Sequence, residues 1–299
     1  MKALKNYSIL ALATMILISC DGGKTDAGLT HVTLVDKKED KKIDYQTEKV
    51  NDIFFSIPSP IEMAGLIKGS GSKYNADLLN DIRNRDKYTS SYSKAINLGI
   101  YGADLSYTSV FNRNQESILY MSSAKQLADE LGVSAAFNSD VMNRIEENVD
   151  NRDSLLGIIS ETFYILDAYL KENNRSSVSA QVISGGWIEG LYIAACVYED
   201  DEAKSPELIT RIVDQKYALD DLIALVESYN AKGDLDVIHT DLSDLKKLFA
   251  KSKSVKVDPP KNKAGKVVLG GDEKLTMERV DLMALVKKLK EIRGRYTSA

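Results

Sequence analysis

Four side chains in the middle of the chain are of types that bind small molecules or exchange protons with them: Asp104, Trp187, Glu189 and Tyr192. Asp104 belongs to a narrow polar strip in an apolar segment, and the other three lie in the most apolar segment after residue 20. Burial of an ionised Glu189 in this segment would cost several kcal/mol in lost hydration, unless an ion pair or hydrogen bonds offset that cost. The resulting rise in its pKa is one that active-site acids share.

A structural interpretation of the same residues competes with the functional one. One acid does not form a catalytic constellation, and tyrosine hydroxyls or an Arg or Lys are expected to satisfy Glu189. A single tryptophan such as Trp187 is more often a core residue than a binding platform. The strip with Asp104 is more typical of a partly solvated seam between helices than of a cleft.

No grouping of residues in the sequence has the spacing of a metal or cofactor site. His239 has no other histidine to join it except His31, which does not provide a histidine-rich metal site. The acidic run at 199–202 lacks the alternating ligands and the glycine of a calcium loop. We find no Gly-x-Ser-x-Gly elbow, phosphate loop or His-Glu-x-x-His motif. We therefore expect no metal and no cofactor, and a non-enzymatic protein is favoured over an enzyme.

A different chemistry is indicated at Cys20, at the end of an export signal. Lys2 and Lys5 precede an apolar run at about 7–18, which is too short for a transmembrane helix and suits the hydrophobic region of a signal peptide. Residues 17–20 read Leu-Ile-Ser-Cys. This sequence resembles the lipobox of bacterial lipoproteins at all four positions.

The resemblance implies that Cys20 carries a diacylglyceryl group, that cleavage falls just before it, and that the new amino end is acylated by a fatty acid such as palmitate. Two or three acyl chains on one residue make attachment effectively permanent. We expect the membrane as a partner through lipid on Cys20, in the cell envelope, with the outer membrane favoured and its periplasmic or surface side left open. The alternatives are an ordinary signal peptide with a chance cysteine, or an uncleaved anchor.

Charge and cysteine content exclude further classes. The net charge of the 299-residue chain is −5, and loss of Lys2 and Lys5 with the signal makes the remainder more acidic. Such a protein lacks the basic face that nucleic acids require, so we expect no nucleic-acid partner. Only Cys196 remains once Cys20 is lipidated, so an intramolecular disulfide is not expected.

The chain is predicted to have three parts. Residues 1–19 form the signal peptide. Residues 20–51 are polar, mixed in charge and without apolar periodicity, which is typical of a disordered tether. Residues 52–299 are long enough and apolar enough for a single helical domain with one core.

Apolar residues recur at helical spacing through most of this domain. Ser59, Pro60 and Glu62 have the types and spacing of a capped helix start. The last helix is expected to present its leucines inward and many of its Lys and Arg residues outward. We predict helices at about 59–68, 75–80, 90–111, 115–131, 139–148, 150–173, 178–197, 205–229, 234–251 and 275–296.

The helix predicted at 178–197 is expected at the centre of the domain. It contains Gly185, Gly186 and Gly190, and each mid-helix glycine costs about 1 kcal/mol relative to alanine. The fold recovers this cost most simply where another backbone approaches closely.

Together these features predict an all-α fold, an antiparallel multi-helix bundle or a layered helical array, with a small β-hairpin near 254–269. The layout resembles that of helical lipoproteins common in Bacteroidota, a resemblance that implies no function. Imelysin-type lipoproteins are also helical, but their Gly-x-His-x-x-Glu motif is absent from this sequence, so iron uptake by that route is not expected.

Two functions from different classes follow. The first is a membrane-anchored cell-envelope lipoprotein, a non-enzymatic helical module that binds a ligand or holds an envelope protein as its partner. The alternative is a small-molecule binder or enzyme with an interhelical pocket around Asp104, Trp187, Glu189 and Tyr192. A polar cavity shared by Asp104 and Glu189 would favour the second function, and separate structural partners would favour the first.

Overall fold

In the computed structural model, helix α7 (Ser176–Asp200) lies at the centre of the helical array and packs against α2, α3, α6, α8 and α10. Its backbone meets that of α3 (Ser91–Val110) directly. A Cβ atom added to Gly185 would lie 2.1 Å from the carbonyl oxygen of Ile96, and one added to Gly99 would lie 1.9 Å from that of Val182. The predicted close approach of a second backbone is therefore confirmed at Gly185.

The structure describes residues 57, 59–148, 150–200, 206–256 and 273–298. These residues belong to one compact unit, Ile43–Ala299. The predicted signal peptide at 1–19, the lipobox with Cys20 and the tether at 20–51 lie outside the described residues.

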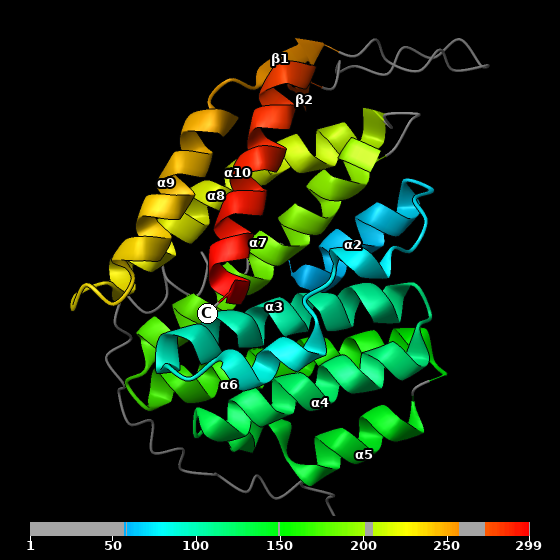
Figure 1. The fold of residues 1–299 in the computed structure, drawn as a ribbon, viewed down its shortest axis with the longest axis vertical. Helices are drawn as coiled ribbons and strands as arrows, with labels where there is room; N and C mark the ends of the chain where they lie inside the picture. Colours follow the sequence, from blue (N-terminus) through cyan, green and yellow to red (C-terminus); the bar gives the residue numbers. More distant parts are fainter. Residues whose placement is uncertain (1–56, 58, 149, 201–205, 257–272, 299) are drawn as a thin grey trace, which may run out of the picture. The chain divides into compact units, whose positions relative to one another are not determined.

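One group of helices packs around α3 and the first half of α7. Helix α2 (Pro60–Gly69) begins at the predicted capping box, in which the Ser59 side chain accepts the N–H of Glu62 and the Glu62 carboxylate accepts that of Ser59. Helix α4 (Asn114–Glu130) runs beside α3 (Figure 1). Helix α6 (Arg152–Glu172) contacts both α3 and α7.

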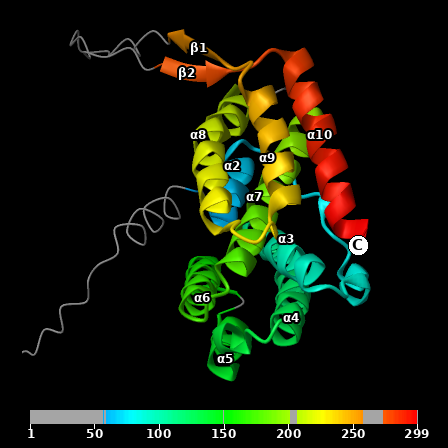
Figure 2. The ribbon, with the colours of Figure 1, turned by 90° about the vertical axis from the view of Figure 1, so that its left-hand side faces the viewer.

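The short helix α5 (Ser139–Glu147) and the 3-10 turn η3 (Ser134–Phe137) pack against α6. A second group consists of α8 (Pro206–Tyr229), α9 (Asp236–Phe249) and α10 (Arg279–Ser298) (Figure 2). Helices α8 and α10 pack on α7, and α9 packs on α8 and α10. Since α7 belongs to both groups, one continuous core joins them. The all-α fold predicted from the sequence is confirmed.

A two-stranded hairpin precedes the last helix. Strand β1 (Lys253–Lys256) pairs antiparallel with β2 (Glu273–Thr276), with Ser254 opposite Leu275. The predicted hairpin is confirmed, although its second strand comes later in the chain than expected. The part of the predicted hairpin at 257–269 lies outside the described residues.

The helix predicted at 75–80 is wrong. The chain forms two short 3-10 turns instead, η1 (Ala76–Leu78) and η2 (Ile82–Lys87). The Asn75 side chain accepts the N–H of Asp77 at 3.0 Å, and the Asp81 side chain accepts that of Arg83 at 2.9 Å. Such local bonds between side chain and backbone compete with a continuous helix. The other predicted helices are present, with ends shifted by a few residues.

Candidate functional site

A buried ion pair joins the central helix α7 to α10. Arg293 donates from Nε to Glu189 Oε2 at 3.1 Å and from Nη2 to Glu189 Oε1 at 3.0 Å. This two-bond geometry is the strongest form of the pair. The Glu189 side chain is 0% exposed and that of Arg293 is 15% exposed, so the pair holds two charges away from water.

Asp104 of α3 lies beside this pair and is also fully buried. Its Oδ2 atom accepts the backbone N–H of Asn80 at 3.2 Å, while Oδ1 has no hydrogen-bond partner among the described residues. Burial, and next the negative charge of Glu189, raise the pKa of Asp104 well above its ordinary value. Both effects favour the protonated, neutral form of Asp104 beside the ion pair.

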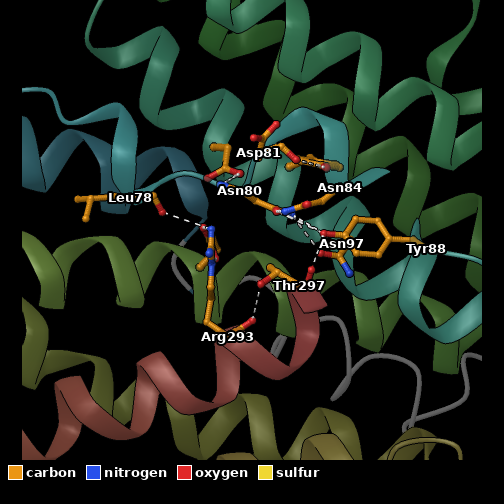
Figure 3. A network of polar contacts seen from close by, with 11 residues as sticks. Leu78, Asn80, Asp81, Asn84, Tyr88, Asn97, Arg293 and Thr297 are labelled. Carbon is orange, nitrogen blue, oxygen red and sulfur yellow. Dashed lines mark hydrogen bonds and ion pairs between the residues drawn. The ribbon is translucent and has the colours of Figure 1, made fainter. Parts of the chain in front are cut away.

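A polar network around Asn80 closes this region. The Asn80 amide donates to Tyr88 Oη at 2.9 Å and to Asn97 Oδ1 at 3.2 Å. Asn97 in turn donates to the carbonyl of Tyr296 at 2.8 Å. Figure 3 shows Asn80 and Asn97 side by side, and Arg293 reaching the carbonyl of Leu78. The loop before η2 and the end of α10 are thereby tied to α3.

The same network corrects one expectation from the sequence. The polar strip of α3 was predicted to be partly solvated, but Asn97, Asp104 and Thr108 are all buried. Asn80, between η1 and η2, contacts Asp104 and Asn97, and the end of α10 accepts a hydrogen bond from Asn97. The helical period of α3 alone does not predict which other segments of the chain bury this strip.

Tyr192 completes the group around the ion pair. The guanidinium carbon of Arg293 lies 4.8 Å from the centre of the Tyr192 ring, a cation–π distance. The structure thus brings together three of the four residues singled out in the sequence, Asp104, Glu189 and Tyr192, and adds Arg293. The fourth, Trp187, lies elsewhere.

Arg293 is the residue that sequence reasoning missed. Many of the Lys and Arg residues of the last helix were predicted to face outward, and Arg293 was not singled out as one that faces inward. A signal was present, because Leu282, Val286, Leu289, Arg293 and Tyr296 follow the i, i+4, i+7, i+11, i+14 spacing of one helix face. The basic residue on an apolar stripe was the partner that Glu189 required.

Trp187 lines a cavity of about 370 Å³ between α2, α3, α6 and α7, which we call the Trp187 cavity. The indole N–H of Trp187 donates to Gln215 Oε1 of α8 at 3.2 Å, so its polar atom is satisfied inside the protein. Asp104, Glu189 and Tyr192 are not among the lining residues. The walls are mainly apolar and include Ile57, Pro60, Ile159, Phe163, Leu166 and Val182.

The Trp187 cavity has one buried polar cluster in its wall. Asp167 of α6 is 6% exposed and Ser179 of α7 is 1% exposed. The Ser179 hydroxyl donates to Asp167 Oδ1, and Lys171 Nζ lies 2.8 Å from Asp167 Oδ2. Sequence reasoning missed Asp167, although it lies next to the apolar positions of α6 and four residues before Lys171.

Other chemistry expected from the sequence can be compared with the described residues. Among them, no three His, Cys, Asp or Glu side chains form a group that could hold a metal ion. Cys196 is buried, and burial raises the pKa of its thiol to about 11. Helix α7 is long and apolar enough to cross a membrane, but 89% of its apolar window is buried inside the protein, as in a core helix.

The two features differ in what they can do chemically. In the ion pair, Glu189 and Arg293 satisfy each other away from water, which gives the pair a structural role in joining α7 to α10. The Trp187 cavity offers apolar walls and room for a small molecule.

Comparisons with models of known protein families, with curated proteins and with solved structures found no match.

Proposed function

We propose that this protein is a lipid-anchored, non-enzymatic binding protein of the cell envelope, which holds an apolar small molecule in the Trp187 cavity. The observation that carries the binding function is the cavity itself, with a volume of about 370 Å³ and mainly apolar walls. Ligand pockets in proteins are typically about 300–1,000 Å³ and apolar, with a few placed polar groups.

Physical chemistry supports an apolar ligand. Each Å² of apolar surface removed from water contributes about 25 cal/mol of favourable free energy. The walls formed by Ile159, Phe163 and Val182 supply such surface. The acyl chains predicted on Cys20 would hold the protein at a membrane. Apolar molecules are concentrated there, so the anchor and the cavity serve the same function. A protein partner in the envelope stays a prediction.

A fluorescent probe tests the cavity. N-phenyl-1-naphthylamine is apolar and neutral, and it accepts energy from tryptophan. Trp187 is the only tryptophan of the chain and lies in the wall of the cavity, so its energy transfer reports on this site. We expect saturable, Trp187-sensitised probe emission from the full chain, purified at a fixed detergent concentration.

Two matched substitutions separate the cavity from other apolar surface. Val182→Phe places a larger side chain in the cavity. It should weaken binding of the probe by about tenfold or more, because the phenylalanine ring takes the space that the rings of the probe would occupy. Val280→Phe makes the same change at a residue that is 71% exposed and should leave binding unchanged. The proposed binding function is overturned if the wild type gives no saturable signal, or if both variants bind equally.

A further inference from the structure

The buried polar side chains of the Trp187 cavity have already used their hydrogen atoms within the protein. The Ser106 hydroxyl donates to the carbonyl of Gly102 at 2.8 Å, and the Ser179 hydroxyl donates to Asp167. The indole N–H of Trp187 donates to Gln215. Toward the cavity, these groups present hydrogen-bond acceptors: two hydroxyl oxygens and a carboxylate.

The charge of the cluster formed by Asp167, Ser179 and Lys171 further limits which ligands can bind beside it. The Asp167 carboxylate is paired with the Lys171 ammonium, so the cluster carries no net charge. At this cluster, a cationic ligand would lose its hydration without finding an unpaired anion, and an anionic ligand would meet the lone pairs of Asp167 and Ser179. A neutral ligand avoids both penalties.

We propose that the ligand of the Trp187 cavity is a neutral apolar molecule with a hydroxyl or N–H group, which donates a hydrogen bond to Asp167 beside Ser179. This inference rests on the proposed function and specifies its ligand class. Each carboxylate oxygen has more than one lone pair. Asp167 can therefore accept a ligand hydrogen while it keeps Ser179 and Lys171.

The alternative is that Asp167 only ties α6 to α7 through Ser179. A purely structural cluster would not distinguish a ligand that donates a hydrogen bond from one of the same shape that cannot. Two probes make this distinction. In 1-benzylnaphthalene a CH₂ group replaces the N–H of N-phenyl-1-naphthylamine, and its affinity can be measured by displacement of the fluorescent amine.

The experiment compares the ratio of the two dissociation constants in wild type and in Asp167→Leu, at one detergent concentration so that partition into detergent cancels. We expect the preference for the amine to be about threefold to tenfold greater in wild type, the value of one hydrogen bond. Ser179→Ala should keep the preference, because the carboxylate remains. If Asp167→Leu does not fold, Asp167→Asn keeps the shape and should reduce the preference.

The outcomes separate this inference from the function on which it rests. If both probes bind the wild type but Asp167→Leu has the same ratio, the ligand class is overturned and the apolar binding site stands. If neither probe gives a saturable signal with the wild type, the binding function and the ligand class both fail. A loss of the preference in Ser179→Ala as complete as in Asp167→Leu would overturn the assignment of Asp167 as the acceptor.

Discussion

At the scale of single residues, Asp104 and Glu189 are both buried acids, but they should respond differently to removal of their charge. Glu189→Gln leaves the buried guanidinium of Arg293 without its anion, which should lower the free energy of unfolding by about 3–5 kcal/mol. Asp104→Asn keeps the shape of an acid whose neutral form is favoured by burial. We expect it to match the wild type within about 1 kcal/mol at pH 4, as measured by urea unfolding.

The pH dependence tests the state of Asp104 directly. With its pKa raised above the ordinary 3.8, folded Asp104 keeps a proton that the unfolded chain loses above that pH. The contribution of Asp104 to the free energy of unfolding therefore falls as pH rises, by up to about 1.4 kcal/mol per unit until the raised pKa is passed. Asp104→Asn does not titrate there, so its stability relative to wild type should increase from about pH 4.

An exposed substitution provides the control for both measurements. Glu146→Gln changes the same atoms as Glu189→Gln at an exposed position of α5 and should stay within about 0.5 kcal/mol of the wild type. Parallel pH profiles for wild type and Asp104→Asn would contradict a raised pKa of Asp104. An equal loss of stability in Asp104→Asn and Glu189→Gln at pH 4 would do so as well.

Sequence reasoning could predict which residues would be unusual, but not how they would pair. Glu189 was recognised from its apolar surroundings, which fix the cost of burial without the structure. Its partner is 104 residues away in the chain, and no local sequence pattern predicts a contact over that separation. Asp167 was overlooked for a related reason, because its role depends on a cavity formed by four separate helices.

At the scale of elements, the contact between α3 and α7 depends on glycines that leave no room for a side chain. Gly185→Ala would place a methyl group 2.1 Å from the carbonyl oxygen of Ile96. Because this neighbour is backbone, the helices must separate, and we expect a loss of about 1–3 kcal/mol or more in the free energy of unfolding. Thermal or urea unfolding measures the effect.

Gly157 supplies the matched control for this substitution. It also lies within a helix, α6, but a Cβ atom there would meet nothing within 4 Å. Gly157→Ala should therefore raise stability by up to about 1 kcal/mol through helix propensity alone. If both alanine variants were stabilised, the close contact between α3 and α7 would be wrong.

Elements with a long apolar period were the ones that the sequence predicted well. The helices α3, α7 and α8 were all expected close to their observed bounds, because a stripe over many turns is a strong signal. The turns η1 and η2 were not, since side-chain caps at Asn75 and Asp81 decide them locally. Strand β2 is only four residues long, too short for its alternation to identify it.

At the scale of the whole molecule, the ion pair and the cavity share one helix. Glu189 follows Trp187 by two positions, which places their side chains about 200° apart around α7. On one side Glu189 binds Arg293 of α10, and on the other Trp187 lines the cavity with α2, α3 and α6. The ion pair on one side of α7 therefore helps to fix the position of this helix, which forms a wall of the cavity on its other side.

The proposed attachment of the whole molecule to a membrane can be tested through its cysteines. The chain has two cysteines, Cys20 and Cys196. If the lipobox is used, intact-mass analysis of the native protein should show a chain that begins at Cys20 and carries a diacylglyceryl group and a further acyl chain. After complete unfolding, a thiol reagent should label one sulfur only, because a thioether provides no thiolate.

The buried thiol makes this test more selective. Folded protein should take up almost no label at pH 8, because Cys196 is buried and burial raises its pKa to about 11. The unfolded Cys196→Ala variant should then take up none, which assigns the single label of the wild type. A native chain that begins at Met1, or one that takes up two labels when unfolded, would contradict the anchor. The Trp187 cavity would then have to meet its ligand without the membrane concentrating it.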